Sequence, residues 1–286
     1  MTTNQELIDT NQDAALGYLD KKPGLNPAKA ILKRGNSIPK YHWARDKVDT
    51  RDYLYLPSGN KIAATSRVDL RQYCTAIEDQ GSLGSCTGNA IAGAIELLNN
   101  RNGRYQDISR LFIYYYERLM LGTINYDSGA YIRDGIKVAY NYGAAVEALW
   151  PYQISKFKTR PTQPAILDGQ KRKITLYERV TNLAGCIDAI SQGYPVIVGF
   201  NVYSSFNNLG VRNTGMMPYP NVAKEKLLGG HAVLLVGYDA VAKRFTARNS
   251  WGARWGDKGY FYMPYQVIEN TSMSGDFWII KSVNNP

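Results

Sequence analysis

The chain has 286 residues and a mass of 32.0 kDa, and 44% of its residues are hydrophobic. This is enough to bury a sizeable core in one large domain or two lobes, and it excludes a disordered chain or a fibre. The formal net charge is +10, from 34 basic and 24 acidic side chains, which can attract polyanions but carries no information about the fold.

The first 65 residues are predicted to be an appended segment. Four prolines break residues 1–65 into short, weakly periodic pieces, so no long helix is expected there. These are Pro23, Pro27, Pro39 and Pro57. We predict a regulatory or pro-like extension that packs on the body of the protein or covers a site.

Residues 66–286 are predicted to form the body, which begins with a helical lobe of about 66–170. Residues 86–100 place their apolar side chains on one broad helical stripe, which predicts a buried helix. Residues 111–121 and 132–142 are also predicted to be helices. No internal repeat is present.

A β-rich, barrel-like lobe of about 171–286 is predicted to follow. Short runs rich in β-branched and aromatic residues alternate there with glycine and polar turns. The predicted strands cover residues 174–180, 195–202, 232–238, 245–248, 259–263 and 277–283. The predicted fold class is therefore α+β, with two lobes.

The cysteine content indicates a reducing compartment. Three cysteines, Cys74, Cys86 and Cys186, are too few and odd in number for a disulfide framework. The first 25 residues lack the apolar core of a secretory signal, and no apolar stretch reaches the roughly 18 residues that span a bilayer. We expect an intracellular protein, or one packaged in a particle, without a membrane partner; the oligomeric state stays open.

Cys86 is the candidate nucleophile. It follows the polar loop of residues 81–85 and begins the first predicted helix, so backbone N–H groups should point at its sulfur. That field favours the thiolate and is expected to lower the pKa of the thiol. Cys74 and Cys186 lie in no such turn, and we interpret them as small buried hydrophobic residues.

A proton acceptor for this thiol must come from one of only two histidines. His231 is preferred, because Gly229 and Gly230 leave its approach open and a buried strand follows. His42 lies in the extension, where a surface or packing role is expected. Asn249, at the end of a predicted strand, can hold the imidazole of the base.

Two further residues complete the site. Trp251 can shield the bond between Asn249 and the imidazole from water. Gln80 can place its amide N–H beside the backbone N–H of Cys86, and two such donors form an oxyanion hole. These groups call for no metal and no cofactor.

Taken together, these residues resemble the papain-like cysteine proteases, the group that includes the cathepsins. His231 follows Cys86 at that family's spacing of about 130 to 150 residues, and Asn249 lies slightly farther. The likeness covers most of the body, and it includes Val68-Asp69-Leu70-Arg71, Asp79-Gln80-Gly81, Tyr142-Gly143, Trp150-Pro151-Tyr152 and Gly259-Tyr260.

The resemblance implies a two-lobed fold with the active-site cleft between the lobes and a peptide or protein substrate. It assigns Cys86, His231, Asn249 and Gln80 the roles of nucleophile, base, orienting residue and oxyanion donor. It also makes three residues candidates for substrate binding, namely Gly129, Gly230 and Trp251.

The sequence departs from the family at several positions. Leu83 stands where many secreted members have a cysteine, and Thr87 replaces the aromatic residue that usually follows the nucleophile. Residues 1–65 lack the long helical pattern of cathepsin pro-segments. The chain is more similar to the signal-less members of microbes and large viruses.

Three other functions remain open. A papain-like acyltransferase would use the same acyl-enzyme, and a catalytically silent binding module would keep only the shell. Nucleic-acid binding has only charge and tyrosine content behind it, with no binding motif. Residues 155–179 carry seven basic and two acidic side chains, so Lys171, Arg172 and Lys173 are candidates for a polyanion or nucleotide contact, although a solvated face is the simpler interpretation.

Overall fold

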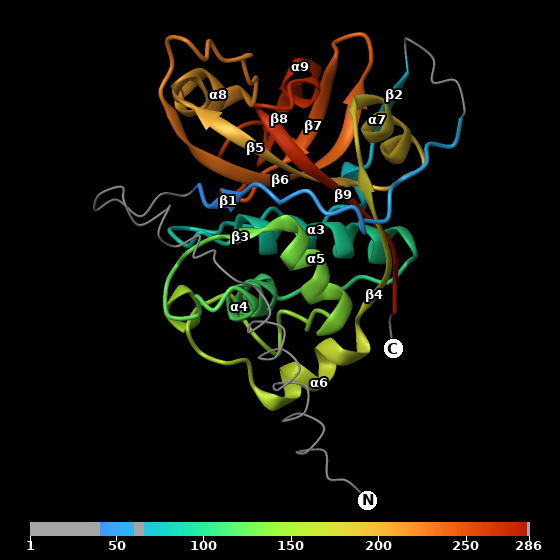
Figure 1. Ribbon diagram of the computed structural model, residues 1–286, viewed down its shortest axis with the longest axis vertical. Helices are drawn as coiled ribbons and strands as arrows, with labels where there is room; N and C mark the ends of the chain where they lie inside the picture. Colours follow the sequence, from blue (N-terminus) through green and yellow to red (C-terminus); the bar gives the residue numbers. More distant parts are fainter. Residues whose placement is uncertain (1–40, 60–65, 285–286) are drawn as a thin grey trace, which may run out of the picture.

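The computed structural model describes residues 41–59 and 66–284. The predictions made for residues 1–40 and 60–65, including three of the four prolines, lie outside this part. Two lobes are visible in Figure 1, with the helices between residues 86 and 171 below and most of the sheet above. The α+β, two-lobed class is therefore confirmed.

The lower lobe consists of four helices. They are α3 (Cys86–Arg101), α4 (Arg110–Met120), α5 (Ile132–Asn141) and α6 (Gln163–Lys171). The first three confirm the predicted helices to within one residue at each end. At the start of α4 the Ser109 side chain accepts a hydrogen bond from the N–H of Phe112, which satisfies one of the free donors of the first turn.

The upper lobe is built on an antiparallel sheet of seven strands. Its main path runs β4-β9-β5-β6-β7-β8, and the short β2 pairs with β6. The strands are β2 (Arg67–Asp69), β4 (Ile174–Val180), β5 (Val196–Tyr203), β6 (Leu227–Asp239), β7 (Arg244–Arg248), β8 (Tyr260–Pro264) and β9 (Ser274–Val283). All six predicted strands are present, and β6 begins five residues earlier than predicted.

Four helices were not predicted: α6 and three in the upper lobe, α7 (Leu183–Ser191), α8 (Leu209–Thr214) and α9 (Tyr265–Glu269). None exceeds nine residues, which is too short for a 3.6-residue period to be distinguished from a loop or a strand. No helix in residues 41–59 and 66–284 is long and apolar enough to cross a membrane.

Helix α3 joins the lobes, since it is buried along almost its whole length and packs on β6. A buried polar cluster fixes it to the end of β7. Arg248 donates to the hydroxyl of Thr75 at 2.9 Å, and this hydroxyl donates to Glu96 of α3 at 2.5 Å. Burial raises the pKa of Glu96 to about 7. The cluster positions the site, because Arg248 directly precedes Asn249.

Candidate active site

Cys86 is the first residue of α3, as predicted, and it is fully buried. Burial raises the pKa of its thiol to about 11, against the opposing effect of backbone hydrogen bonds with Ala232, His42 and Thr87. This direction is opposite to the one expected from the sequence. The helix N-terminus is present, but another part of the chain excludes water from the sulfur.

His231 lies in β6, and Asn249 directly follows β7, which pairs with β6 through Leu234 and Arg248. Nε2 of His231 lies 2.8 Å from Oδ1 of Asn249, so Nε2 carries a proton and donates it to the amide oxygen. The indole of Trp251 stacks on the imidazole at a centroid distance of 4.7 Å and an angle of 24°. The indole therefore lies where it is expected to shield the His231–Asn249 hydrogen bond from water. Since Ala232 follows His231 and bonds to the sulfur of Cys86, the base and the thiol lie on facing elements.

Gln80 is buried beside the same loop. Its Nε2 donates to the carbonyl of Leu83 at 2.9 Å, and its Oε1 accepts from the hydroxyl of Ser250 at 2.6 Å. The backbone N–H of Gln80 also donates to the carbonyl of Ser250 at 2.8 Å. These bonds tie Gln80 both to the loop before Cys86 and to the residue after Asn249.

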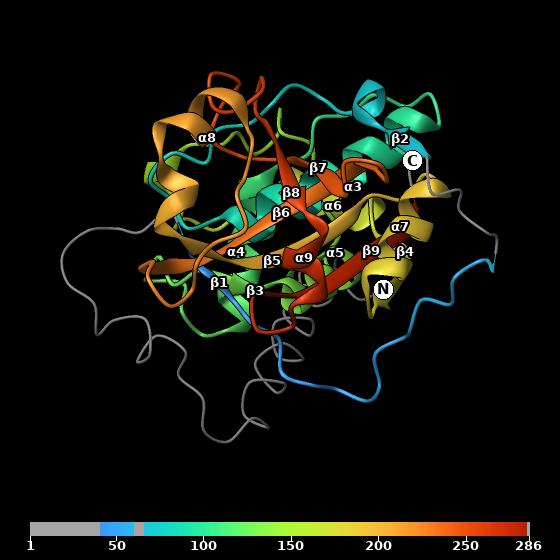
Figure 2. The ribbon, with the colours of Figure 1, turned by 90° about the horizontal axis from the view of Figure 1, so that it is seen from above.

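Residues 41–46, here called the covering segment, pass between the two lobes. Figure 1 shows β1 (Trp43–Ala44) between α3 and the sheet, and Figure 2 shows it beside β3 (Ala130–Tyr131) and β5. β1 pairs in parallel with β3, and His42 forms a parallel bridge with Gly230. The N–H of Ala130 donates to the carbonyl of His42 at 3.3 Å. The covering segment therefore contacts both lobes at the site.

The glycines predicted to bind substrate contact this segment. A Cβ on Gly129, whose φ is +70°, would lie 2.0 Å from the carbonyl oxygen of His42, and one on Gly230 would lie 2.4 Å from that of Trp43. A Cβ on Gly199 of β5 would lie 2.0 Å from the indole of Trp43. The segment fits because these residues have no side chain.

Each aromatic side chain of the covering segment packs at the site. Tyr41 meets Trp251 edge to face at a centroid distance of 5.7 Å. Trp43 is buried and donates its Nε1–H to Asp276 at 3.1 Å. His42 is 4% exposed, with Nδ1 at 3.9 Å from Asp127, and neither of its ring nitrogens has a hydrogen-bond partner among the described residues. The sequence predicted that His42 either lies on the surface or packs against the body, and the structure shows that it packs.

Asp46 anchors the end of the covering segment. Its carboxylate accepts from Nε1 of Trp278 at 3.0 Å and from the N–H of Arg133 at 3.2 Å, and it forms an ion pair with Arg179 at 3.3 Å. Its own N–H donates to Asp276 at 2.7 Å. Burial, together with the charge of Asp276, raises the pKa of Asp46 to about 7.

The sequence predicted an extension packed across the lobes with part of it at or near the cleft, but it did not indicate which residues would lie there. The available signal was the aromatic run from Tyr41 to Trp43, but a second such run, Tyr53 to Leu56, lies in the same extension.

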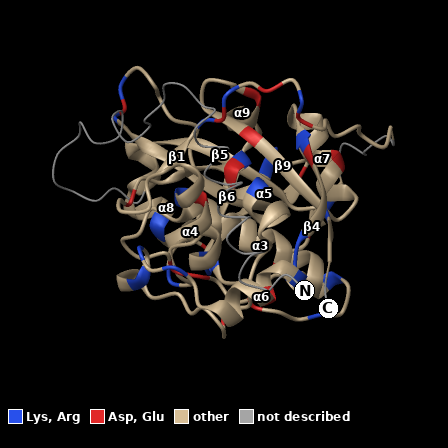
Figure 3. Cartoon of the chain, turned by 60° about the horizontal axis from the view of Figure 1, so that its bottom comes forward, with Lys and Arg blue, Asp and Glu red and all other residues tan. Residues whose placement is uncertain are grey.

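The three candidate polyanion residues do not form one surface. Lys171 is exposed at the end of α6, Arg172 is buried in an ion pair with Asp168, and Lys173 is half-buried. Arg172 also donates to Gln106 at 2.5 Å. Lys and Arg residues are spread among Asp and Glu residues over both lobes in Figure 3.

The comparisons with known proteins agree on one family. A family model for papain family cysteine proteases matches residues 64–278. An uncharacterized peptidase C1-like protein of Acanthamoeba polyphaga mimivirus is 39% identical over 235 residues, which cover 76% of this chain and 75% of that protein. Cathepsin K of Gallus gallus is 30% identical over 215 residues, which cover 72% of this chain and 60% of that protein.

The solved structures agree with this result. Xylellain, a cysteine protease from Xylella fastidiosa, is 38% identical with a TM-score of 0.80, and the match covers 87% of this chain and 98% of that chain. Digestive procathepsin L 3 of Tenebrio molitor, at 19% identity and a TM-score of 0.66, shares the fold over 90% of this chain and 80% of that chain. The resemblance found in the sequence is therefore confirmed, and the chain belongs to the papain family of cysteine proteases.

Proposed function

We propose that this protein hydrolyses peptide bonds through Cys86, with His231 as general base and acid, Asn249 as orienting residue and Gln80 as oxyanion donor. The observation that carries the proposal is the 2.8 Å bond between His231 and Asn249 beneath Trp251. It holds the imidazole in the tautomer with a proton on Nε2, which leaves the lone pair of Nδ1 for the thiol.

In the proposed reaction, Nδ1 of His231 takes the thiol proton and the sulfur of Cys86 attacks the peptide carbonyl carbon. The oxyanion accepts hydrogen bonds from the backbone N–H of Cys86 and the side-chain amide of Gln80. The imidazolium then gives its proton to the leaving amine, and a thioester remains. A water molecule that loses a proton to His231 attacks the thioester, and the acid is released with the thiol restored.

Two alternatives use the same fold. An acyltransferase would pass the acyl group to an amine, and competition between water and an added amine separates this from hydrolysis. A catalytically silent binding module needs no oriented imidazole, so the bonds that hold His231, Asn249 and Gln80 favour an enzyme.

We also propose that residues 1–65 are a pro-like extension whose covering segment keeps the enzyme latent. The support is that Cys86 is fully buried with a backbone hydrogen bond to His42, and that residues 41–46 contact both glycines proposed to bind substrate, Gly129 and Gly230. A peptide substrate cannot reach the sulfur while the segment is in place. The described cysteines are all free, which supports the proposal of a reducing compartment.

A thiol-directed epoxide tests the assignment of the nucleophile. In the full chain we expect slow labelling, because the thiol of Cys86 is buried and its pKa is raised. In a Trp43→Ala variant, whose covering segment is weakened, we expect Cys86 to react much faster than Cys74 or Cys186 at pH 6. The measurement is peptide mapping of the labelled cysteine, and equal labelling of all three would contradict the proposal.

The pH dependence of the covering segment tests the role of His42. Burial lowers the pKa of His42, so docking of the segment weakens as the pH falls below about 6.5. Asp46 acts in the opposite sense, since its raised pKa makes docking stronger as the pH falls through about 7. In the wild type the two effects oppose each other. In the His42→Gln variant the effect of Asp46 remains without that of His42. It changes the docking equilibrium constant by at most about tenfold per pH unit.

We therefore expect the covering segment of the His42→Gln variant to dock more tightly at pH 5 than at pH 7. The measurement is the rate of Cys86 labelling, divided at each pH by the rate of the same protein with Trp43→Ala added, which cancels the ionisation of the thiol. A His42→Gln variant with the same pH profile as the wild type would exclude this role.

A further inference from the structure

A pocket lies away from the proposed catalytic residues. Its volume is about 750 Å³, within the range of small-molecule sites. One wall comes from residues 49–53, and the other walls come from α4, α5, α6 and the start of β4. None of the four proposed catalytic residues lines it. The peptidase reaction therefore does not account for the pocket.

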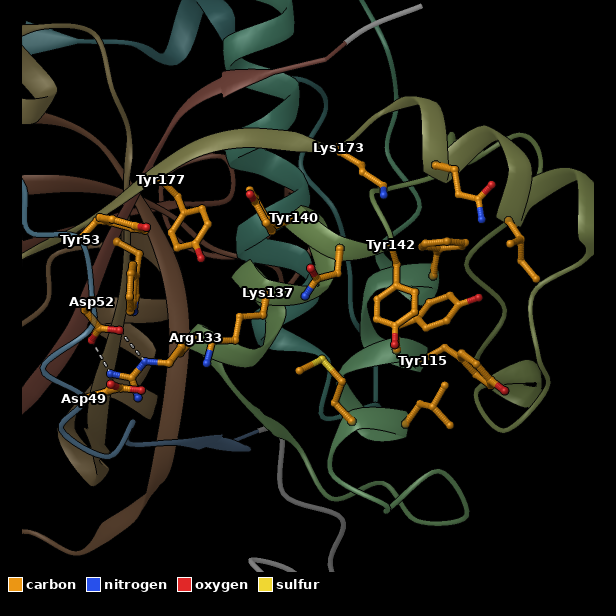
Figure 4. Close-up of a pocket in the computed structure, with 18 of the residues that line it drawn as sticks. Asp49, Asp52, Tyr53, Tyr115, Arg133, Lys137, Tyr140, Tyr142, Lys173 and Tyr177 are labelled. Atoms are coloured by element: carbon orange, nitrogen blue, oxygen red, sulfur yellow. Dashed lines mark hydrogen bonds and ion pairs between the residues drawn. The ribbon is translucent and has the colours of Figure 1, made fainter. Parts of the chain in front are cut away.

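Aromatic rings form much of its surface. At one end Tyr142 stacks on Tyr116 at a centroid distance of 4.5 Å and an angle of 21°. At the other end Tyr140 and Tyr177 meet edge to face at 5.5 Å, with Tyr53 beside them at 6.5 Å from Tyr177. Tyr53 and Tyr140 are exposed, and Figure 4 shows both rings at the pocket. Exposed tyrosine rings can stack on a flat ring of a ligand.

The acidic groups of the pocket are already neutralised. Asp52 accepts from Nε of Arg133 at 3.0 Å and forms an ion pair with it, drawn as dashed lines in Figure 4. Asp49 accepts two hydrogen bonds of 2.8 Å from Arg51. A negatively charged ligand would therefore not meet an uncompensated carboxylate.

Three cations of the pocket have no such partner. They are Lys137, Arg160 and Lys173, and no described residue forms an ion pair with any of them. Lys137 and Lys173 are half-buried, and Figure 4 shows Lys173 extending from the start of β4 toward the space between Tyr140 and Tyr142. Arg160 is exposed and lines the pocket together with Tyr115.

We propose that this pocket binds a small molecule that carries both an aromatic ring and a phosphate group. Three uncompensated cations match the charge of −1.5 to −2 of a phosphate better than the single charge of a carboxylate. The exposed rings of Tyr53 and Tyr140 supply the surface for the ring of the ligand. A nucleotide and an aryl phosphate share this chemistry.

The binding test uses the full chain with Cys86→Ser, so that failure of the proposed hydrolysis cannot affect it. Isothermal titration is made with adenosine 5′-monophosphate, phenyl phosphate, adenosine and inorganic phosphate. We expect at least one aromatic phosphate to bind about tenfold more tightly than either adenosine or inorganic phosphate. Tighter binding of the nucleotide than of phenyl phosphate identifies the nucleotide as the source, and the reverse order identifies the aryl phosphate.

Lys173→Gln and Lys171→Gln form a matched pair, because they remove the same charge two residues apart and only Lys173 lines the pocket. Lys173→Gln is expected to weaken binding by about tenfold or more, as loss of a charge-assisted hydrogen bond does, whereas Lys171→Gln leaves it unchanged. Thermal melting confirms that both variants are folded. Absence of binding at millimolar concentration, or equal losses in the two variants, would overturn the proposal.

Discussion

Alanine at Cys86 or at His231 is expected to lower kcat/KM for a peptide substrate by at least about 10⁴-fold, because each removes a group that transfers electrons or a proton in the transition state. The two losses should be nearly equal, and the double variant should lose no more than either single one. The measurement is hydrolysis of a fluorogenic peptide in the Trp43→Ala background, in which the covering segment is weakened.

The other site residues should show graded losses. Asn249→Ala is expected to retain roughly 10- to 100-fold more activity than His231→Ala, because it orients the ring without transferring a proton. Gln80→Ala should lower kcat by roughly 10- to 1,000-fold, as loss of one oxyanion donor does. His42→Ala is the control histidine, and it should keep or raise activity. If His42→Ala inactivated the enzyme while His231→Ala did not, the site would be wrongly assigned.

Trp43→Ala is expected to raise the peptidase activity of the full chain. Trp43 is buried against Gly199 and Gly230 and bonds to Asp276, so its loss removes packing and a hydrogen bond from the covering segment. Loss of a buried tryptophan costs about 3 to 5 kcal/mol, which corresponds to roughly 10²- to 10⁴-fold in the docking equilibrium. The measurement is the initial rate on a small peptide substrate, taken before any cleavage of the chain is detected.

Val48→Ala is the matched control for this change, because Val48 follows in the same extension and is 94% exposed. It should leave the rate unchanged. Equal rates for Trp43→Ala and the wild type, with both proteins folded by thermal melting, would mean that the extension stabilises the fold without inhibiting the enzyme.

The regular elements were predictable where the pattern was long. Residues 86–100 carry apolar side chains on one stripe over four turns, and the structure has a helix there, Cys86–Arg101. α7 was missed because only nine residues form it, and its start depends on Asn182, whose side chain accepts from the N–H of Gly185. Such a cap is one polar residue in the sequence and does not stand out among turn residues.

The candidate residues of the site could be chosen from the sequence, but the burial of the thiol could not be predicted. Cys86, His231 and Asn249 became the candidates because few residue types can perform the chemistry and only two histidines are present. The raised pKa of Cys86 could not be found, because it depends on whether water reaches the sulfur. That depends on contacts such as the one between His42 and Cys86, which lie 44 positions apart, and no local pattern contains them.

The covering segment lies in the same chain as the cleft that it fills, so the two meet at an effective concentration of the order of millimolar, whatever the amount of protein. The strand pairing of the covering segment is short, since β1 has only two residues. The buried side chains of Trp43 and Asp46 supply most of the other contacts that keep it in place. The next stretch exposes Val48 and Leu56 at 94% and 82%. A single cut in this stretch would turn the segment into a separate peptide, whose rebinding depends on its own concentration and no longer on the millimolar one. If the segment inhibits the enzyme as proposed, one broken bond followed by dilution would favour the active form.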